Sequence, residues 1–361
     1  MMEFGRRYVV RIFGSSHGPE VGVEIDGIPA GTPIDPGAIQ QQLDRRRPVG
    51  RRLATKRQEE DRLQIDRGLD GQRSDGGTLR AHVANEDVRR EPYDRLRNTP
   101  RPGHADYPAR VRYGPDADLS GGGIFSGRMT VGLVIAGSIA QQLLRPLGVT
   151  TVAFTRSIAD VRAEVPESTA FEELRAAAAA NEVGCPDPVL AARMEATIAD
   201  ARRSGDSVGG TVEVRIAGVP VGLGEPFFDS IESEVAHLAF SVPAVKAIEF
   251  GSGFAGTRLR GSENNDPFRW SGDRVVTTTN HAGGVLGGLA TGMPIVYRAA
   301  VKPTSSIARS QPTVDLATHA NADLTITGRH DPCIVPRAVV VLESVGAIAI
   351  ADLALQGGFL R

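Results

Sequence analysis

The sequence predicts a globular domain of the α/β or α+β class. Five short runs rich in β-branched residues alternate with stretches of helical periodicity, which indicates a chain that builds both sheets and helices. The strand-like runs are residues 9–13, 21–25, 212–216, 275–278 and 295–301. Hydrophobic residues make up 41% of the 361 residues and charged residues 23%, which is typical of a folded domain and argues against disorder or a coiled coil.

Two helices are indicated by their own start signals. The dipeptides Asp-Pro at 35–36 and 187–188 each put an N-cap aspartate before a proline at the first helical position. After the second dipeptide, Leu190, Met194 and Ile198 recur at four-residue spacing, as on one face of a helix. We therefore expect a helix to begin at each proline.

Two apolar stretches are predicted to be buried. The stretch between Arg128 and Arg145 is interrupted by glycines and glutamines and falls short of the ~18 residues that a membrane span needs. A second helix-like apolar run begins at Val335. The first residues include no apolar stretch that resembles a signal peptide. We expect a cytoplasmic protein.

A weak internal repeat predicts two related halves. Residues 23–31 (VEIDGIPAG) are echoed by residues 214–222 (VRIAGVPVG), and a helical pattern follows each of them. A strand, a Gly-x-Pro-x-Gly turn and a helix that occur twice would pack on one core. A common turn that arose twice would give the same signal.

Charge and cysteine content narrow the classes of function. The formal net charge is −2, which disfavours nucleic-acid binding through a strongly basic surface. Arginine and lysine nevertheless crowd into residues 45–57, which would suit a small anionic ligand. Cys185 and Cys333 are the chain's two cysteines, too few for a disulfide framework or a cysteine-based zinc site, and we expect no metal.

Four polar segments could carry chemistry. None of them has the spacing of a common metal site, a nucleophile elbow or a nucleotide-binding loop. They are residues 14–18 (GSSHG), 101–106 (RPGHAD), 302–306 (KPTSS) and 328–333 (GRHDPC). Each also has a purely structural explanation, namely a turn histidine, a solvated loop, a structural turn and an N-cap aspartate. The residues alone leave both explanations open.

The chemical interpretation of these segments points to an anionic ligand. His17 and His104 lie in loops of small residues, and a histidine with its ordinary pKa of ~6.5 suits a general acid. Lys302 precedes hydroxyl side chains at a strand end, an arrangement that could hold a phosphate or the pyrimidine edge of a flavin. Asp331 precedes the apolar run from Val335, at a helix start where anions are favoured.

Taken in order, these segments resemble those of the chorismate synthase family. Further matches are residues 44–48 (DRRRP), 205–210 (GDSVGG), 222–226 (GLGEP), 244–246 (AVK), 261–266 (GSENND) and 280–284 (NHAGG). The resemblance implies an α+β fold, a β-α-β sandwich of two related halves, in a single domain over residues 1–361. It also implies a homotetramer.

The resemblance further implies a lyase of the shikimate pathway of aromatic amino acid biosynthesis. Its reaction is the 1,4-elimination of phosphate from 5-enolpyruvylshikimate 3-phosphate to give chorismate, with reduced FMN as the cofactor. Whether NADPH reduces the flavin on the protein itself or a separate flavin reductase does so stays open. The substrate would be a small anion, and neither a nucleic acid nor a membrane is expected as a partner.

The resemblance also implies roles for single residues. His17 would protonate the departing phosphate, His104 would protonate or stabilise the reduced flavin, and Asp331 would assist proton removal through flavin N5. The implied flavin contacts are Ser126, Pro243, Ala244, Gly287, Lys302, Pro303, Thr304, Ser305, Ser306 and Arg329. The implied substrate contacts are Ser16, Arg46, Arg52 and Arg128, of which Arg46 and Arg52 also correspond to arginines associated with the nicotinamide nucleotide.

Two loops depart from the family pattern. Residues 121–130 are GGGIFSGRMT where the family usually has GGGRSSARET, and residues 74–78 are SDGGT in place of TTGTP. Loss of a phosphate-facing arginine should cost about 1.5–3 kcal/mol per charged hydrogen bond. Three hypotheses follow: an ordinary family enzyme, a paralogue that acts on a related shikimate-type phosphate in a specialised pathway, and a non-catalytic flavin-binding relative. Retention of His17, His104 and Asp331 disfavours the third.

Overall fold

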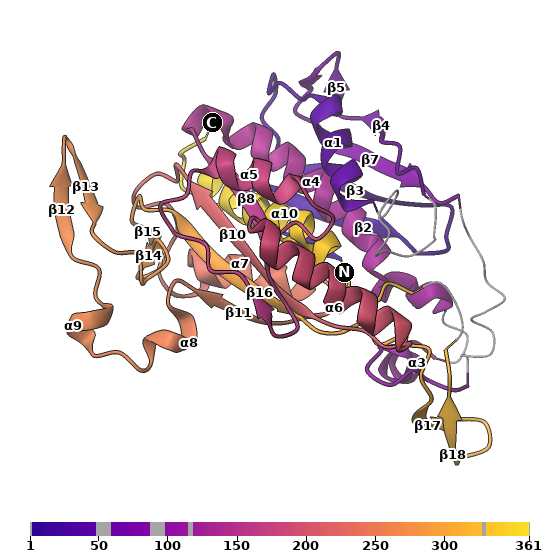
Figure 1. Cartoon of the computed structure of the whole chain (residues 1–361). Helices are drawn as coiled ribbons and strands as arrows, with labels where there is room; N and C mark the ends of the chain where they lie inside the picture. Colours follow the sequence, from indigo (N-terminus) through magenta and orange to yellow (C-terminus); the bar gives the residue numbers. More distant parts are fainter. Residues whose placement is uncertain (1, 48–58, 87–97, 115–117, 327–329, 361) are drawn as a thin grey trace.

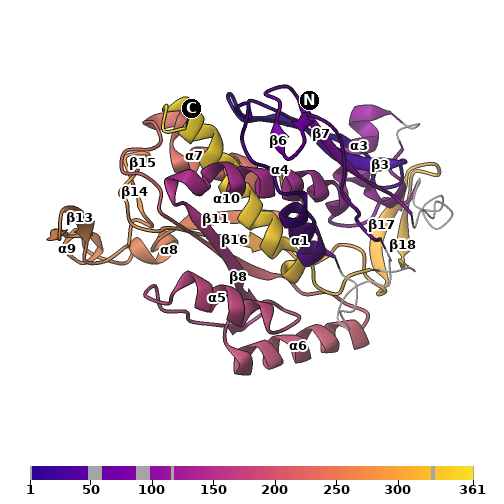
Figure 2. The same cartoon turned by 90° about the horizontal axis from the view of Figure 1, so that it is seen from above.

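The computed structural model describes residues 2–47, 59–86, 98–114, 118–326 and 330–360. In this part of the chain, two five-stranded antiparallel sheets enclose a layer of helices (Figure 2). The first sheet has the order β1 (Glu3–Phe4), β2 (Val9–Gly14), β3 (Glu20–Asp26), β7 (Leu79–Ala84) and β4 (Gln64–Arg67). The second has the order β11 (Val245–Phe250), β16 (Ile295–Val301), β10 (Gly210–Ala217), β8 (Thr150–Ile158) and β9 (Val161–Arg162).

The helical layer joins the two sheets. α4 (Thr130–Leu144) packs on the first sheet, α10 (Val335–Gln356) packs on the second, and the two helices pack against each other. They cross closely at Gly137, because a Cβ placed there would lie 2.2 Å from Cβ of Ser344. α10 is long and apolar enough to cross a membrane, but its apolar stretch is wholly buried as the core helix of the fold. Both apolar stretches are helices, as predicted.

The predicted helix starts are confirmed. Asp35 caps α1 (Pro36–Arg46) by accepting a hydrogen bond from the backbone N–H of Gly37 at 2.8 Å. Asp187 caps α6 (Pro188–Arg203) in the same way. α1 joins the helical layer, whereas α6 and α5 (Phe171–Ala179) lie on the outer side of the second sheet (Figure 2).

The repeated Gly-x-Pro-x-Gly turns occupy matching places in the two halves. Each follows a strand that lies between two antiparallel neighbours, β3 between β2 and β7, and β10 between β8 and β16. A Cβ on Gly27 would lie 1.6 Å from the backbone oxygen of Arg7, and one on Gly218 would lie 2.2 Å from that of Gly148. A central helix follows each turn, α1 in the first half and α7 (Ile231–Ser241) in the second. The combination of antiparallel sheets with helices confirms the predicted α+β class.

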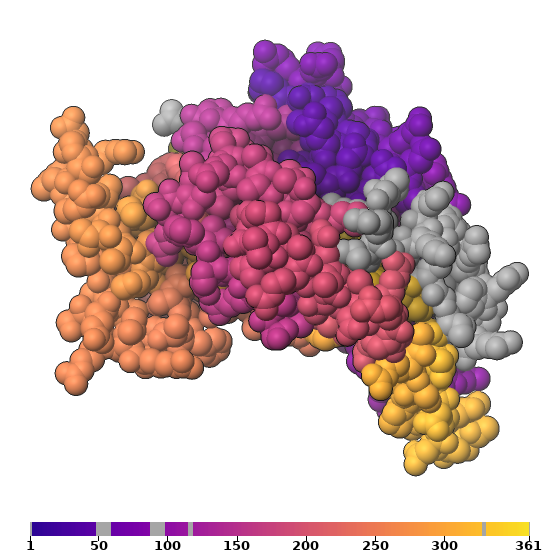
Figure 3. Space-filling view, in the orientation of Figure 1, coloured from indigo at the N-terminus to yellow at the C-terminus, as the bar shows by residue number. Residues whose placement is uncertain are grey.

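Smaller elements complete the chain. They are β5 (Leu69–Asp70), β6 (Arg73–Ser74), α3 (Asp106–Tyr113), η1 (Ser120–Phe125), η2 (Gly127–Met129), η3 (Arg145–Leu147), η4 (Phe227–Asp229), α8 (Gly253–Gly256), α9 (Gly261–Asn264), β12 (Phe268–Ser271), β13 (Arg274–Thr277), β14 (Val285–Leu286), β15 (Leu289–Ala290), β17 (Gln311–Asp315) and β18 (Ala320–Leu324). Two hairpins project from the body: β12–β13, with α8 and α9 at its base, and β17–β18 on another side (Figures 1 and 3).

Candidate functional site

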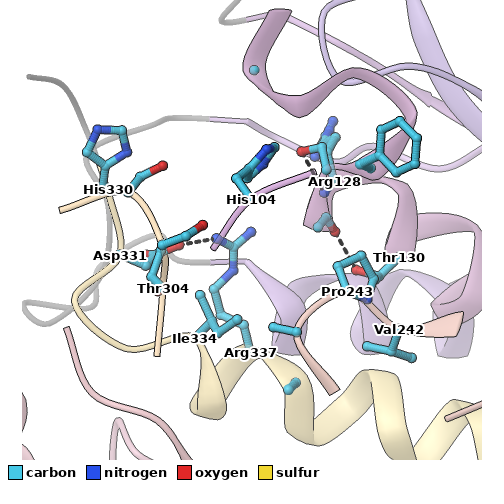
Figure 4. Close-up of a pocket in the computed structure, with 18 of the residues that line it drawn as sticks. His104, Arg128, Thr130, Val242, Pro243, Thr304, His330, Asp331, Ile334 and Arg337 are labelled. Atoms are coloured by element: carbon cyan, nitrogen blue, oxygen red, sulfur yellow. Dashed lines mark hydrogen bonds and ion pairs between the residues drawn. The ribbon is translucent and has the colours of Figure 1, made fainter. Parts of the chain in front are cut away.

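A cavity of about 560 Å³ opens where the loops before α3, α4 and α10 meet (Figure 4). Segments that are distant in sequence line it, namely residues 101–105, 121–130, 241–244, 302–306 and 330–341. α1 and the segment that follows it add Arg46, Glu59 and Asp61. Three of the four polar segments singled out in the sequence, 101–106, 302–306 and 328–333, therefore contribute residues to one cavity.

Most of the expected site residues lie at this cavity. Those that line it are Arg46, His104, Ser126, Arg128, Pro243, Ala244, Lys302, Pro303, Thr304, Ser305, Ser306 and Asp331. Arg52 and Arg329 lie outside the described residues. Ser16, His17 and Gly287 do not line the cavity, and Gly287 lies in the turn between β14 and β15.

His17 lies immediately behind the cavity wall. Its side chain is buried, and a Cβ placed on the cavity-lining Gly121 would lie 1.9 Å from the ring Cε1. The neighbouring Ser16 donates its backbone N–H to the carbonyl of Gly123 at 3.3 Å. The loop that carries His17 is thus held against the 121–123 glycines, and the ring of His17 lies next to Gly121, which lines the cavity.

The second histidine lines the cavity and has a carboxylate behind it. Nδ1 of His104 lies 2.6 Å from Oδ1 of Asp106, a buried side chain that also forms an ion pair with Arg101 at 2.7 Å. Burial raises the pKa of Asp106, but hydrogen bonds from Arg101 and His104 outweigh it and hold that pKa well below its ordinary value. Nη1 of Arg101 donates to Oγ of Ser306 at 3.2 Å, which links this group to the 302–306 segment.

Two expected substrate-binding arginines share a buried carboxylate. Nη1 of Arg46 lies 3.3 Å from Oδ2 of Asp61, and Nη1 of Arg128 forms a close ion pair with the other oxygen of Asp61. Nη2 of Arg128 also lies 3.7 Å from Oε2 of Glu59. Nε of Arg46 donates to Oγ1 of Thr130 at 3.0 Å, at the start of α4. These contacts hold both guanidinium groups rigidly in the wall.

Asp331 and Lys302 lie on other walls of the cavity. Nη1 of Arg337, in the first turn of α10, lies 2.7 Å from Oδ2 of Asp331 (Figure 4). Nζ of Lys302 donates to the backbone oxygen of Gly103 at 3.0 Å. Burial, together with the charge of Lys246, lowers the pKa of Lys302 from its ordinary value.

Two buried polar atoms of the cavity lining have no hydrogen-bond partner among the described residues. They are Oγ1 of Thr304 and Nε2 of His330. Burial and the charge of Arg101 lower the pKa of His330, against the opposing effect of Asp331, so its ring is neutral near pH 7. Because buried polar atoms are normally paired, these two indicate where a bound ligand would complete the site.

The sequence interpretation missed several polar residues of the site, among them Glu59, Asp61, Thr130 and Ser241 on the cavity lining. Arg101, His330 and Arg337 line the cavity, and Asp106 lies directly behind His104. Arg101, Asp106 and His330 belong to the RPGHAD and GRHDPC segments, where only His104, Arg329 and Asp331 were chosen.

In the described part of the chain, no three His, Cys, Asp or Glu side chains are placed to hold a metal ion.

The two loops that depart from the family pattern differ in position. Ile124 and Phe125 both line the cavity, and the Phe125 ring lies 6.1 Å from that of Tyr113, measured between centroids. The 74–78 loop, in contrast, does not line the cavity. Ser74 is buried in β6 beside the first Gly-x-Pro-x-Gly turn, where the backbone N–H of Gly31 donates to its carbonyl at 2.8 Å.

Comparisons with known proteins agree with this geometry. The family model described as chorismate synthase matches residues 8–355. The chorismate synthase of Dehalococcoides mccartyi strain BAV1 is 44% identical over 356 residues, which cover 99% of this chain and 97% of that protein. The chorismate synthase of Korarchaeum cryptofilum is 46% identical over 349 residues, with 97% and 96% covered. A crystal structure of a chorismate synthase superimposes with a TM-score of 0.78 at 26% identity and covers 98% of this chain and 93% of that one. With the cavity, the sandwich and these relatives in agreement, the chain belongs to the chorismate synthase family.

Proposed function

We propose that the chain is a lyase that converts 5-enolpyruvylshikimate 3-phosphate into chorismate and phosphate with reduced FMN. In this 1,4-elimination the C3–O bond breaks with its electron pair leaving on phosphate, the C6–H bond breaks, and a new double bond forms without net change in oxidation state. When bound, reduced FMN supplies electron density transiently and takes up the hydrogen from C6. The observation that best supports this proposal is a single cavity lined by His104, by several cationic side chains and by Gly121, next to which His17 lies.

The charge of the cavity suits this substrate. Among the residues that the structure describes, five cationic side chains line it and outnumber its three carboxylates. The cations are Arg46, Arg101, Arg128, Lys302 and Arg337, and the carboxylates are Glu59, Asp61 and Asp331. A phosphate and two carboxylates on one small molecule call for several fixed donors, and guanidinium groups held by Asp61 and Asp106 are already oriented before the substrate arrives.

His17 is the proposed acid for the leaving phosphate. Its ring occupies the space that a side chain on the cavity-lining Gly121 would need, which places it next to the cavity. A proton given to the departing oxygen stabilises the negative charge that develops on it, an effect that typically contributes 10²–10⁴-fold for a general acid. A substrate phosphate would therefore lie against the 121–123 glycines.

His104 and Asp331 are the other two proposed catalytic residues. His104 would protonate or stabilise the reduced flavin, and Asp331, held by Arg337 at 2.7 Å, would assist removal of the C6 proton. Both side chains line the same space (Figure 4). Their roles rest on this placement and on membership of the family.

The lining fits a flavin cofactor. The 302–306 segment offers a cation and hydroxyl groups, and the unsatisfied Oγ1 of Thr304 and Nε2 of His330 are free to hydrogen-bond a polar group on the ligand. Ser126, Pro243 and Ala244 complete the surface that would hold FMN. NADPH, bound near Arg46, or a separate flavin reductase would keep the flavin reduced.

We also propose a cytoplasmic homotetramer. Large apolar side chains are exposed on the β12–β13 hairpin, α8 and η4, which is typical of a surface that another subunit covers. They include Phe227, Phe228, Phe254, Phe268 and Trp270. Cys185 and Cys333 are both buried free thiols, which fits a reducing compartment.

An anaerobic assay with chemically reduced FMN tests the proposal. It compares phosphate release from 5-enolpyruvylshikimate 3-phosphate with release from shikimate 3-phosphate. Release from the first compound together with formation of chorismate supports the proposed function. Release from shikimate 3-phosphate alone would favour the paralogue instead, for which the apolar Ile124 on the cavity wall is the supporting observation. A protein that binds FMN and releases phosphate from neither compound would be a non-catalytic relative.

A further inference from the structure

Asp106 is fully engaged between two residues of the candidate site. Its Oδ2 accepts hydrogen bonds from Nε of Arg101 at 2.7 Å and from the backbone N–H of Arg101 at 3.0 Å. Its Oδ1 accepts from Nη2 of Arg101 at 2.8 Å and lies 2.6 Å from Nδ1 of His104. The carboxylate is buried in the first turn of α3. These donors therefore provide the hydrogen bonds that water would provide to an exposed carboxylate.

The contacts of His104 decide where its ring proton lies. Nη2 of Arg101 is 3.1 Å from Nδ1 and could bond it only if Nδ1 carried no hydrogen, because a guanidinium donates and never accepts. An ionised Asp106 accepts only, so its contact requires a hydrogen on Nδ1. The two demands are incompatible. The contact to the carboxylate is the shorter one, and hydrogen bonds to a charged acceptor are the stronger kind.

The ionisation of Asp106 supports the same choice. Burial raises the pKa of this carboxyl, but hydrogen bonds from Arg101 and His104 more than offset the effect and keep the pKa below its ordinary value. Asp106 is therefore an acceptor throughout the physiological pH range, and the ring hydrogen belongs on Nδ1. The other nitrogen, Nε2, then faces the glycine wall, 3.5 Å from where a Cβ on Gly122 would lie.

We propose that Asp106 is a positioning residue that fixes His104 as the Nδ1–H tautomer, so that Nε2 is the atom that exchanges a proton with the ligand in the cavity. The role of that exchange rests on the proposed function, whereas the tautomer does not. Arg101 contacts both Asp106 and the 302–306 segment, because it forms hydrogen bonds to the Asp106 carboxylate and also donates to Ser306 at 3.2 Å. The histidine and the 302–306 segment are thus aligned by one guanidinium group.

A purely structural role for Asp106 makes a different prediction. In that case the carboxylate only ties the 101–106 loop to α3, and its loss would lower the free energy of unfolding without changing turnover by the folded fraction. Two measurements separate the two roles: the tautomer of His104, and the change in kcat of the folded protein measured separately from the change in KM. Neither would move if Asp106 were only a support.

The first experiment is a solid-state NMR spectrum of the wild-type protein labelled with 15N-histidine, without flavin or substrate and at alkaline pH. The His104 signals are assigned by their loss in His104→Gln. We expect a protonated Nδ1 and an unprotonated Nε2. A protonated Nε2 would overturn the proposal. Because no turnover is needed, this result stands even if the protein fails to make chorismate, in which case only the proposed function falls.

The second experiment uses Asp106→Asn. The amide oxygen should take the Oδ2 position, where two donors of Arg101 converge, which turns the NH₂ toward Nδ1 of His104. An NH₂ donor there requires an unprotonated Nδ1, so the ring hydrogen should move to Nε2. We expect kcat to fall by about 10–100-fold, as when a residue that orients a histidine is removed, with KM changed by less than about threefold.

A matched control is available on the first sheet. Asp66→Asn removes a carboxylate that lies 3.1 Å from Nδ1 of His82, away from the cavity lining. We expect kcat and the His104 signals of this variant to equal those of the wild type. An Asp106→Asn protein that keeps the wild-type tautomer, or one that changes the tautomer and keeps the wild-type kcat, would overturn the positioning role.

Discussion

The ring of His17 occupies the space that a side chain on Gly121 would need. A Cβ on Gly121 would lie 1.9 Å from Cε1 and 2.3 Å from Nδ1 of His17. Gly121 also has φ +60°, in the left-handed region that residues with a side chain rarely adopt. The wall of the cavity can therefore be thin at this point only because residue 121 is glycine.

The first prediction follows from this contact. Gly121→Ala should displace His17 and lower kcat by about 10²-fold or more, within the range for loss of a general acid. Gly71→Ala is the matched control, since Gly71 has the same φ of +60° and nothing within 4 Å of its added Cβ. Steady-state kinetics and thermal unfolding of both variants provide the measurement. Equal losses of activity would show that backbone strain, and not His17, is responsible.

The second prediction concerns the two histidines themselves. His17→Ala and His104→Ala should each lower turnover by roughly 10²–10⁴-fold while the fold stays intact. His319→Ala, at an exposed position in the turn between β17 and β18, should leave turnover unchanged. Stopped-flow measurements of chorismate formation, with circular dichroism as the check on folding, make the comparison. Near-wild-type turnover in both site variants would reduce these histidines to structural residues.

The third prediction is a pH dependence of stability. The pKa of Asp106 is lower in the folded protein than its ordinary value of ~3.9, because the hydrogen bonds from Arg101 and His104 outweigh burial. Its contribution to the free energy of unfolding is then fully present above about pH 4–5 and is lost as the pH falls through the lower folded pKa. The stability difference between the wild type and Asp106→Asn should be constant from about pH 5 to 7 and should shrink below about pH 4.

Urea unfolding at several pH values measures this difference. Asp70→Asn, at an exposed position in β5, is the control and should show no difference that depends on pH in the same range. The wild type is expected to lose its extra free energy of unfolding over Asp106→Asn as the pH falls. If this difference stays constant or grows on acidification, Asp106 is not an ionised partner of Arg101. The comparison needs neither flavin nor substrate.

The local features of the fold could be predicted because their causes lie within a few residues. Asp35 bonds the backbone two residues ahead, so the helix start is visible in the sequence itself. The two Gly-x-Pro-x-Gly turns are visible for the same reason, since Gly27 and Gly218 have positive φ, a conformation that favours glycine. Such signals also located three of the segments that form the cavity.

The pairing of charges in the site could not be predicted in the same way. Asp61 joins Arg46 and Arg128, which come from opposite sides of it in the sequence and meet only when α1 packs on α4. No periodicity marks such a contact. Asp106 was visible only as a neighbour of His104, and the sequence does not show that both of its oxygens are occupied by Arg101. The expected roles of His17, His104 and Asp331 stay predictions.

The last prediction concerns the departure from the family pattern at Ile124 and Phe125. Ile124 lines the cavity and is 40% exposed, so an arginine at this position could reach the ligand. The double substitution Ile124→Arg with Phe125→Ser restores the cation and the hydroxyl of the usual family sequence. If the chain were a paralogue whose substrate lacks one carboxylate, the double variant should shift kcat/KM toward 5-enolpyruvylshikimate 3-phosphate by about tenfold or more, equivalent to ~1.4 kcal/mol.

The structure favours the opposite outcome. Five cationic side chains already line the cavity in the described part of the chain, and Arg46 and Arg128 are held in place by Asp61 before any ligand binds. A sixth cation would add to an excess of positive charge and would also have to be ordered at a partly exposed position, where an ion pair is worth little. We therefore expect the unmodified protein to turn over 5-enolpyruvylshikimate 3-phosphate efficiently and the double variant to change its kcat/KM by less than about threefold, since ~0.65 kcal/mol corresponds to that factor. Parallel measurements with shikimate 3-phosphate decide the matter, because a tenfold gain for the enolpyruvyl compound relative to the shorter one would show that Ile124 sets the choice of substrate.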